Sequence, residues 1–592
     1  MGSGDTTDRL FTVSGVRGGI NSSGSGALNF TNNGSIAYGA ANAARTLTLT
    51  GTNTGANSFA PVIADNGTGV VTFTKSGAGT WVLAGNNTYT GTTTVGTTGG
   101  ADEGTLELSG LGKISNAATT VYAGNLDVGA TTQTITTLGL GAGASGTAAN
   151  VLIGSGGVLN LGGTLIYTAT NDPNGATISG AGTLNLNGNR ILAVGDSTAA
   201  AADLTISSII ADGSTASAIT SSGTGTLILS GNNTYTGGTT LAVAGATLGV
   251  SHNNALGTGA LALTNAAVTL EAVTNDVVLP NAINVTGAMA FTVSGTQNLT
   301  VNGTFTTASS GTLTNSIGSG KLLTLGNMDI GTGATTMQTF IMSGTGDTAV
   351  IGTIADGPSA TVGQAMSVRS TGITTFSGNN TYSAKTGITA NATLAITNVA
   401  DANVANALGM SPNAVTSLTL TNATLKYTGA AASTDRLFTI QGAADGDYAT
   451  IDASGTGAIN FTNIGSLAYG TAAQTRTLNL TGTNTGNNTL AAKLANNGTG
   501  ASSLNKSGTG TWVLSGNNTY TGNTTISAGT LLVNGYTVAG SAVNVASSGC
   551  RVALKVGRFV ALKVGHFFTR VFSRREGELW DAHFSGVFWP RC

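Results

Sequence analysis

Three acidic side chains, Asp445, Asp447 and Asp452, are the best candidates in the chain for a catalytic or calcium-binding cluster. Enzymes that cleave polysaccharides on a parallel β-helix use clustered carboxylates beside a basic residue, either to hold calcium or to transfer protons. These aspartates, however, lie in a glycine-rich segment, and the corresponding stretch near the start of the chain, residues 17–21, has no acidic residue. Solvated turn aspartates account for this pattern better than an active site does.

Histidine and lysine give no stronger indication of catalysis. The chain has only three histidines, which are His252, His566 and His583. They cannot supply a Ser-His-Asp arrangement or a zinc site within the repeats, and His252 precedes a segment that returns without histidine at residues 405–409, which indicates a turn residue. Lys75 and Lys506 stand at equivalent positions before Ser-Gly, and we expect both on a solvated edge. The sequence thus predicts no catalytic, cofactor-binding or metal-binding residue, and no enzyme.

The composition favours short strands and tight turns. Only 8% of the 592 residues are charged, aromatic residues make up 5%, and the chain contains 90 glycines but 6 prolines. Threonine favours strands, whereas glycine, asparagine and serine accept turn backbone. A net charge of −2 gives no electrostatic footprint for nucleic acid, which we exclude as a partner. No apolar run reaches the roughly 18 residues that a membrane helix needs.

The ends of the chain differ from the rest. Both cysteines, Cys550 and Cys592, lie near the C-terminus, so we expect no disulfide to hold the repeats together. The first residues have neither the basic nor the apolar region of a signal peptide, which indicates either export by another signal or an incomplete N-terminus. Residues 549–592 form a basic, aromatic tail, interpreted as a frameshifted end, a cap, or a membrane- or partner-binding segment.

The strongest signal is a five-residue word, Gly-Asn-Asn-Thr-Tyr, that occurs four times. The copies begin at residues 85, 231, 378 and 516, which are 146, 147 and 138 residues apart. A second word, Ile-Ala-Asp-Gly or a variant, precedes each copy by 21 to 24 residues, beginning at Ile63, Ile210, Ile354 and Leu494. The segment that begins at Arg45 returns at Arg476, 431 residues later and in phase with the four copies. Such regularity indicates a repeat architecture, with a shorter period of 21 to 24 residues inside the longer one.

Alternating apolar residues place one side of each short strand in a core. A segment of about 22 residues cannot bury that side alone, but stacked copies form a continuous core. We therefore predict an all-β, elongated, right-handed parallel β-helix (β-solenoid) over residues 5–548, with some 25 coils about 4.8 Å apart. Leu227, Leu229 and Leu241 should point inward. Trp81 and Trp512 should be equivalent.

The two asparagines of each five-residue word should lie at the corners of the coils. Asn86 and Asn87 represent them in the first copy. We expect them to fill these corners, because asparagine tolerates left-handed backbone and its amide can bond locally or along a ladder. This role is structural and binds no ligand.

The frame Gly-x-Gly-Thr-Leu-x-Leu-Ser-Gly-Asn-Asn-Thr-Tyr-Thr-Gly-x-Thr-Thr resembles the autotransporter-associated β-strand repeat, also called the passenger-associated transport repeat. The match is close at residues 76–108, 222–248 and 506–533, and degraded at 377–394. The resemblance implies a β-helix passenger fragment at a Gram-negative-type cell surface, where the repeat is associated with efficient secretion. It also implies an outer-membrane β-barrel translocator as a partner in the full-length protein.

Two functions follow as hypotheses. The first is a non-catalytic structural or adhesive passenger, extracellular or on the bacterial cell surface, whose partners would be host or cell-surface glycans or proteins. The alternative is a polysaccharide-cleaving β-helix lyase or hydrolase with an unrecognised site. A groove with converging acidic and basic side chains would favour the second hypothesis.

Overall fold

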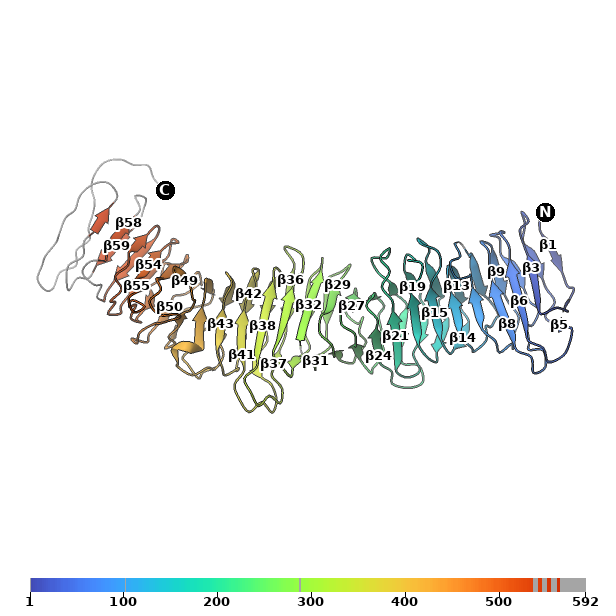
Figure 1. Ribbon diagram of the computed structural model, residues 1–592, viewed down its shortest axis with the longest axis horizontal. Helices are drawn as coiled ribbons and strands as arrows, with labels where there is room; N and C mark the ends of the chain where they lie inside the picture. Colours follow the sequence, from blue (N-terminus) through green and yellow to red (C-terminus); the bar gives the residue numbers. More distant parts are fainter. Residues whose placement is uncertain are drawn as a thin grey trace, which may run out of the picture. The chain divides into compact units, whose positions relative to one another are not determined.

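The computed structural model describes residues 2–101, 103–286, 289–535, 541–545, 551–554 and 562–564 (Figure 1). Within these residues the ladders between strands are parallel, and one short 3-10 helix, η1 (Val415–Ser417), is the sole helix. The chain forms two compact units, Met1–Gly303 and Thr304–Cys592. The prediction of an all-β, parallel β-solenoid is confirmed, whereas the domain boundary expected at residue 548 stays a prediction.

Two long ladders run through unit 1. Each strand of a ladder pairs with the equivalent strand of the coil before and the coil after. The first ladder contains β1 (Asp5–Thr7), β4 (Leu28–Phe30), β7 (Asn57–Phe59), β9 (Thr80–Leu83), β11 (Thr105–Leu108), β13 (Gly124–Gly129), β16 (Ala149–Ile153), β19 (Ala176–Ser179), β22 (Leu204–Ile206), β25 (Thr226–Leu229), β27 (Thr247–Val250), β29 (Val268–Ala272) and β32 (Met289–Gly295). The second contains β3 (Arg17–Asn21), β6 (Arg45–Thr50), β8 (Val71–Lys75), β10 (Thr93–Val95), β12 (Thr119–Val121), β15 (Leu138–Gly141), β18 (Leu165–Thr168), β21 (Arg190–Val194), β24 (Ile219–Ser222), β26 (Thr239–Leu241), β28 (Leu261–Leu263) and β31 (Ile283–Val285).

Shorter ladders complete the coils of unit 1. They consist of β2 (Thr12–Val13) with β5 (Ala37–Tyr38), of β14 (Thr132–Ile135), β17 (Val158–Leu161), β20 (Thr183–Asn185) and β23 (Ile209–Ala211), and of β30 (Val277–Leu279) with β33 (Leu299–Val301).

Unit 2 repeats this design. One of its ladders contains β35 (Gly311–Asn315), β38 (Thr339–Gly344), β41 (Ala365–Val368), β43 (Thr386–Ile388), β45 (Leu418–Leu420), β48 (Thr439–Ile440) and β51 (Ala468–Tyr469). Another contains β36 (Leu322–Leu325), β39 (Asp347–Val350), β42 (Ile373–Phe376), β44 (Thr393–Ile396), β46 (Ala423–Tyr427), β49 (Asp447–Ala453), β52 (Arg476–Thr481), β54 (Ser502–Lys506), β56 (Thr524–Ile526), β58 (Val543–Val545) and β60 (Leu562–Val564). The remaining strands are β34 (Phe305–Thr307), β37 (Met328–Ile330) and β40 (Ile354–Asp356), and β47 (Ala432–Thr434), β50 (Ile459–Phe461), β53 (Asn488–Leu490), β55 (Thr511–Leu514), β57 (Thr530–Val533) and β59 (Arg551–Leu554).

The core of each unit is a stack of inward apolar side chains. In unit 1, Leu229 lies between Ile206 of the coil before and Val250 of the coil after, and its side chain is fully buried. Leu227 and Leu241 are buried in the same way, so the inward positions predicted for all three leucines are confirmed. Alternation along a strand produces this result, because successive side chains point to opposite faces.

Trp81 and Trp512 occupy equivalent positions in their coils, as predicted. Each indole is buried, and its Nε1 donates a hydrogen bond to a carbonyl oxygen 31 residues earlier in the chain. The acceptors are Thr50, at 2.9 Å, and Thr481, at 2.8 Å. The 431-residue phase read from the sequence is therefore a repeat of three-dimensional structure.

Candidate functional site

The second asparagine of the five-residue word is a buried bridge between coils. In the first copy, Oδ1 of Asn87 accepts a hydrogen bond from the N–H of Ile63 at 2.8 Å. Its Nδ2 donates to the carbonyl oxygen of Lys113 at 2.9 Å. Ile63 lies one coil before and Lys113 one coil after, so a single amide joins three consecutive coils.

The other three copies are built on the same plan. Oδ1 of Asn233, Asn380 and Asn518 accepts from the N–H of Ile210 (2.8 Å), Ile354 (2.8 Å) and Leu494 (2.9 Å). Nδ2 of Asn233 and Asn380 donates to the following coil, at Ala255 (2.6 Å) and Ala407 (2.9 Å). Nδ2 of Asn518 instead donates to Gly516 in its own turn, at 3.0 Å. The words that begin at Ile63, Ile210, Ile354 and Leu494 thus supply the partners of the asparagines.

The first asparagine of the word has a different environment. Asn86 is exposed, whereas its neighbour Asn87 is buried. Neither residue has a positive φ, so this corner does not use the left-handed backbone that asparagine tolerates. The N–H of Asn87 donates to the carbonyl of Gly85 at 2.9 Å, which closes a tight turn around Asn86. In the first copy the ladder bonds are those of Asn87, whereas in the second copy Asn232, the counterpart of Asn86, also accepts from Asn254 Nδ2 in the next coil at 2.8 Å.

An acidic or amide side chain two residues after each Ile or Leu clamps the same corner. Oδ1 of Asp65 accepts from the N–H of Val71 at 2.8 Å and of Thr90 at 3.1 Å, and Oδ2 accepts from the Thr90 hydroxyl at 2.6 Å. The equivalent residues Asp212, Asp356 and Asn496 make the corresponding bonds with Thr236, Ser383 and Thr521. Ser383 replaces threonine in the copy at 377–394, and the hydroxyl contact survives the change.

The electrostatics of the corner favour an ionised aspartate. Burial opposes ionisation of Asp65, but hydrogen bonds from Thr90 and Val71 outweigh it and lower the pKa of the carboxyl below its usual value. The same balance between burial and bonds from Thr236 and Ser217 lowers the pKa of Asp212. A carboxylate that accepts backbone N–H bonds is stabilised in its charged form. These carboxylates therefore serve as acceptors within the fold.

The tyrosine that ends the word is a buried strut. Each tyrosine hydroxyl hydrogen-bonds the hydroxyl of a threonine four residues later; the pairs are Tyr89 with Thr93 (2.7 Å), Tyr235 with Thr239 (2.5 Å), Tyr382 with Thr386 (2.6 Å) and Tyr520 with Thr524 (2.6 Å). Burial raises the pKa of Tyr89 to about 12, although its bond to Thr93 opposes the shift. The phenol stays protonated and acts as packing with one internal hydrogen bond.

Lys75 and Lys506 contradict the solvated edge expected for them. Each is the last residue of its strand, and its side chain points inward and is fully buried. Nζ of Lys75 donates to the carbonyl oxygens of Gly77 and Glu103, both at 2.7 Å. Nζ of Lys506 donates to Ser507 at 2.6 Å and to Gly508 at 2.8 Å. The strand pattern contained the signal, because each lysine continues the inward alternation of its strand.

The candidate acidic cluster does not converge on a shared site. Asp445 is exposed and accepts from the N–H of Thr475 at 2.8 Å, as a turn aspartate does. Asp447 is buried, which corrects the prediction of a solvated side chain, and accepts from Asn422 Nδ2 at 2.8 Å. Asp452 accepts from the hydroxyl of Ser454 at 2.5 Å. Within the described part of the chain, no group of three potential metal ligands is found.

His252 is a turn residue, as predicted, and its Nδ1 accepts from the N–H of Asn254 at 3.0 Å. His566, His583, Cys550 and Cys592 lie outside the described residues, as does most of the predicted tail at 549–592. No helix in the described ranges has the length and apolarity needed to cross a membrane.

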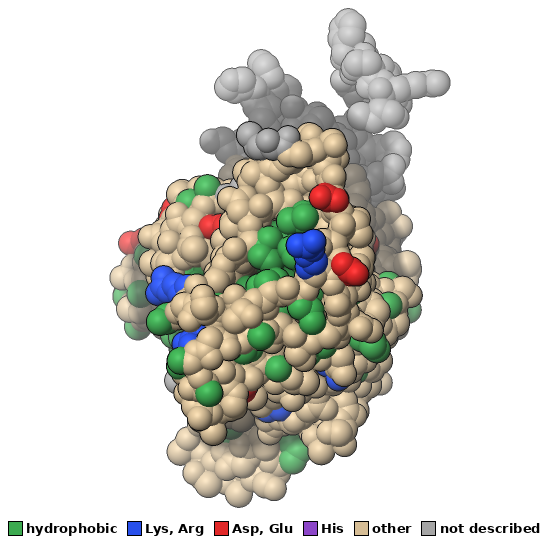
Figure 2. All heavy atoms as spheres, turned by 90° about the vertical axis from the view of Figure 1, so that its right-hand side faces the viewer, with side chains coloured by type: hydrophobic (Ala, Val, Ile, Leu, Met, Phe, Trp, Pro, Cys, Tyr) green, Lys and Arg blue, Asp and Glu red, His purple; other side chains and the backbone are tan. Residues whose placement is uncertain are grey.

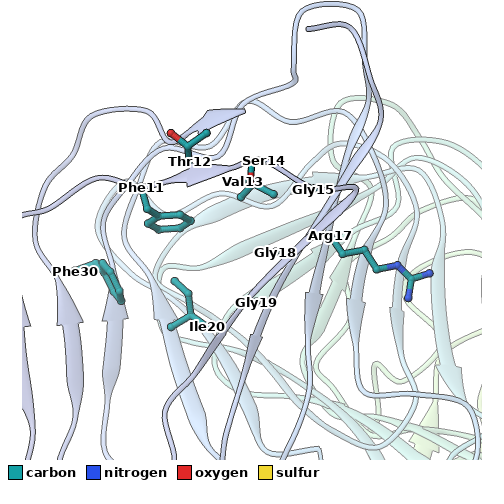
Figure 3. Close-up of a pocket in the computed structure, with 10 residues that line it drawn as sticks. All are labelled: Phe11, Thr12, Val13, Ser14, Gly15, Arg17, Gly18, Gly19, Ile20 and Phe30. Atoms are coloured by element: carbon teal, nitrogen blue, oxygen red, sulfur yellow. The ribbon is translucent and has the colours of Figure 1, made fainter. Parts of the chain in front are cut away.

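A hollow of about 420 Å³ opens at the first coil of unit 1 (Figure 3). Phe11, Ile20 and Phe30 point toward one another there, whereas the side chain of Arg17 points away. The Phe11 and Phe30 rings meet edge to face, with centroids 6.0 Å apart. Arg17 is the one titratable side chain among the residues that line this hollow, so the hollow contains no acid–base pair.

Three segments of the chain match the passenger-associated-transport-repeat family, residues 73–100, 219–249 and 504–533. The chain carries passenger-associated transport repeats. The matched segments contain the corners of Asn87, Asn233 and Asn518. The corner of Asn380 lies outside these segments, yet it has the same pattern of hydrogen bonds. The predicted resemblance is confirmed.

One curated protein shares part of the sequence. A stretch of 140 residues is 46% identical to the protein named "Adhesin BmaC autotransporter" of Brucella suis biovar 1 (strain 1330). The stretch covers 22% of this chain and 4% of that protein, so the chain spans only a small part of the relative's length. No solved structure matches the chain.

Proposed function

We propose that the chain is a non-catalytic, structural or adhesive part of a passenger that is displayed at the surface of a bacterial cell or released from it. The corner geometry carries this proposal. In four copies the asparagine, the aspartate or its amide replacement, and the tyrosine are bonded to other coils or to their own turn. These repeated residues therefore build the solenoid, and in the four described corners they leave no acid, base or nucleophile directed at a substrate.

The outward faces of the strands offer a surface suited to adhesion. On unit 1 a polar row of uncharged side chains crosses neighbouring coils, because Asn150 Nδ2 donates to Asn125 Oδ1 at 3.0 Å and Thr177 donates to Asn150 Oδ1 at 2.8 Å. Asn505 and Asn479 form a similar pair on unit 2, at 3.0 Å. Ordered rows of amides and hydroxyls can present donors and acceptors to glycans or to polar protein surfaces. These are the partners that we propose.

Two further elements of the proposal come from the comparisons. The partial relative bears the name of an autotransporter adhesin, which supports a place at the cell surface or outside the cell. The repeat family supports an outer-membrane translocator as the protein that carries the passenger across the envelope. Both assignments concern a whole passenger protein, because the match spans 4% of the relative's length.

Surface display tests the proposal directly. The chain would be fused to the export signal and translocator of an unrelated autotransporter, and the cells would be applied to wells coated with defined glycans or with matrix proteins. We expect adherence above that of cells that carry the translocator alone. The same cells should release no new reducing ends from the polysaccharides offered.

The aspartate variants separate adhesion from catalysis. Asp445→Ala and Asp452→Ala should leave adherence unchanged, since these side chains bond only to their own or neighbouring turns. Polysaccharide cleavage by the displayed chain, abolished by these substitutions without loss of the fold, would overturn the proposal. The polysaccharide-cleaving alternative would then be favoured. Absence of adherence to every surface would leave a structural role only and would refute the adhesive one.

A further inference from the structure

The sequence Thr-Asp-Arg-Leu-Phe occurs twice, once inside unit 2 and once at the first coil of unit 1. In unit 2 it spans residues 434–438, and the preceding coil, residues 398–428, covers it. The Arg436 guanidinium is 3% exposed and donates to the hydroxyl of Ser411 at 2.6 Å and to the carbonyl of Gly409 at 2.7 Å. The arginine of this motif is therefore a docking group for the coil before it.

The aspartate and the threonine of this copy point to the same coil. The Asp435 carboxylate accepts from the N–H of Ala402 at 2.7 Å and from Asn413 Nδ2 at 2.9 Å. The Thr434 hydroxyl donates to the carbonyl of Ala400 at 2.8 Å. Every polar side chain of the motif is thus bonded to residues 398–428, and a coil is its natural ligand.

Buried apolar side chains and strand pairing complete this interface. Phe438 is fully buried, and Leu418 and Leu420 of the covering coil are buried as well. Strand β45 of the covering coil pairs with β48, and β46 pairs with β49. The backbone and the core of the coil at 434–453 are therefore both closed by the coil before it.

The copy in unit 1 has the same local geometry without the covering coil. The Arg9 N–H donates to the Thr7 hydroxyl at 3.2 Å, as the Arg436 N–H does to Thr434. Yet Arg9 is exposed, and Phe11 is only half-buried. Strands β1, β2 and β3 pair on one side only, with β4, β5 and β6. Figure 2 shows hydrophobic side chains gathered at this end of the unit, beside charged ones.

We propose that this end, the receiving face formed by Thr7, Asp8, Arg9, Phe11 and Ile20, binds a solenoid coil with the chemistry of residues 398–428 that is joined to the chain ahead of Gly2. Such a coil would offer carbonyls and a hydroxyl to Arg9, an N–H to Asp8, and leucine side chains to Phe11. One bond of the unit 2 interface is absent, because valine replaces the Asp447 that contacts Asn422 there.

The path of the chain supports a covalently joined coil. The Gly2 carbonyl accepts from the N–H of Ser25 at 3.1 Å. In unit 2 the Gly429 carbonyl holds the matching place, where it accepts from the N–H of Gly457 at 3.1 Å. Gly429 lies two residues after the end of β46 (Ala423–Tyr427), which pairs with β49. A segment joined to Gly2 would therefore pair with β3 of the receiving face in the same way.

A graft tests the proposal on the full chain. Residues 398–428 would be inserted ahead of Gly2, and amide hydrogen exchange of residues 5–21 would be compared with that of the chain without the graft. We expect exchange of the amides in β2 and β3 to slow by about tenfold or more, because paired edge amides open less often. A control graft with Leu418→Asp and Leu420→Asp should give no protection. A shorter graft of residues 415–428, which carries β45 and β46 only, provides a second test if the longer one misfolds.

Arg9→Ala tests whether the arginine of the receiving face binds the grafted coil. It should leave exchange in the ungrafted chain unchanged, since Arg9 is exposed there, but remove most of the protection in the grafted chain. The proposal would be overturned if amides of residues 5–21 exchanged equally fast in the chain with the original graft and in the chain with the Leu418→Asp and Leu420→Asp graft, while the β25 amides stayed protected. Concentration-dependent protection of the ungrafted chain, with dimers in light scattering, would identify a second copy as the occupant and also overturn it. Neither result bears on adhesion.

Discussion

Replacing Asn87 by alanine should destabilise unit 1 far more than the same change at the adjacent Asn86. The Asn87 amide satisfies the N–H of Ile63 at 2.8 Å and the carbonyl of Lys113 at 2.9 Å. Its loss leaves two backbone groups without a partner in a buried corner, and each such group costs about 1 to 3 kcal/mol. We expect a loss of about 2 to 4 kcal/mol for Asn87→Ala. Asn86 is exposed, so Asn86→Ala should cost less than about 0.5 kcal/mol.

The location of the damage distinguishes a bridge from a simple packing residue. Stability in a solenoid is roughly a sum over neighbouring coils, so the loss should be greatest near the substitution. Native-state hydrogen exchange should show faster exchange at Ile63 in the coil before and in the coil that contains Lys113, while β29 of the same unit keeps its protection. Urea unfolding gives the total change. Equal stability of the Asn87→Ala and Asn86→Ala variants would refute the idea that the buried amide joins the coils.

Three further substitutions probe the core and the corners. Leu229→Ala should cost about 2 to 5 kcal/mol in urea unfolding, because its side chain is buried between two coils, whereas the outward Ile228→Ala should cost much less; equal losses would contradict the core assignment. Lys506→Met should lower the free energy of unfolding by about 2 to 4 kcal/mol, because it leaves buried carbonyl oxygens without a donor. The control Lys385→Met changes an exposed side chain and should match wild type. Unchanged stability of Lys506→Met would instead support the solvated position that the sequence predicted for Lys506. Because the pKa of Asp65 is lowered in the folded chain, its contribution to stability is present above the pKa of the unfolded chain and is lost as the pH falls through the folded pKa. Asp65→Asn should therefore lose less stability than wild type between about pH 5 and pH 2. Parallel plots of unfolding free energy against pH for the two proteins would exclude this linkage.

The stacking of coils could be predicted from the sequence because it depends on spacing alone. Alternation places Leu227 and Leu229 on one face, and a repeat that keeps phase over 431 residues requires equivalent positions for Trp81 and Trp512. The division of labour between Asn86 and Asn87 could not be predicted. Two adjacent identical residues at a corner are distinguished only by which one the turn directs inward, and this depends on three-dimensional geometry.

The errors concern charged residues on inward positions. Lysine is seldom buried, which led to the expectation of a solvated edge, yet Lys75 follows Val71 and Phe73 in strict alternation. The position overrides the residue type because turn carbonyls of this and the next coil surround the amine. Asp447 shows the same effect, since it begins a strand whose alternate residues, Ala449 and Ile451, are buried.

The direction of the bonds has a consequence for how such a chain folds. The partners of Asn87 lie in the coils on either side, as do those of the inward leucines. A coil that lacks one neighbour therefore keeps an unpaired edge and a half-covered core, which the first coil of unit 1 displays at Phe11. Each added coil pairs the unpaired backbone groups and covers the apolar side chains of the previous coil. The stabilising contacts therefore form at the growing end of the solenoid. The solenoid should accordingly extend one coil at a time from any end that is already folded, and the open end should gain the most from the next coil.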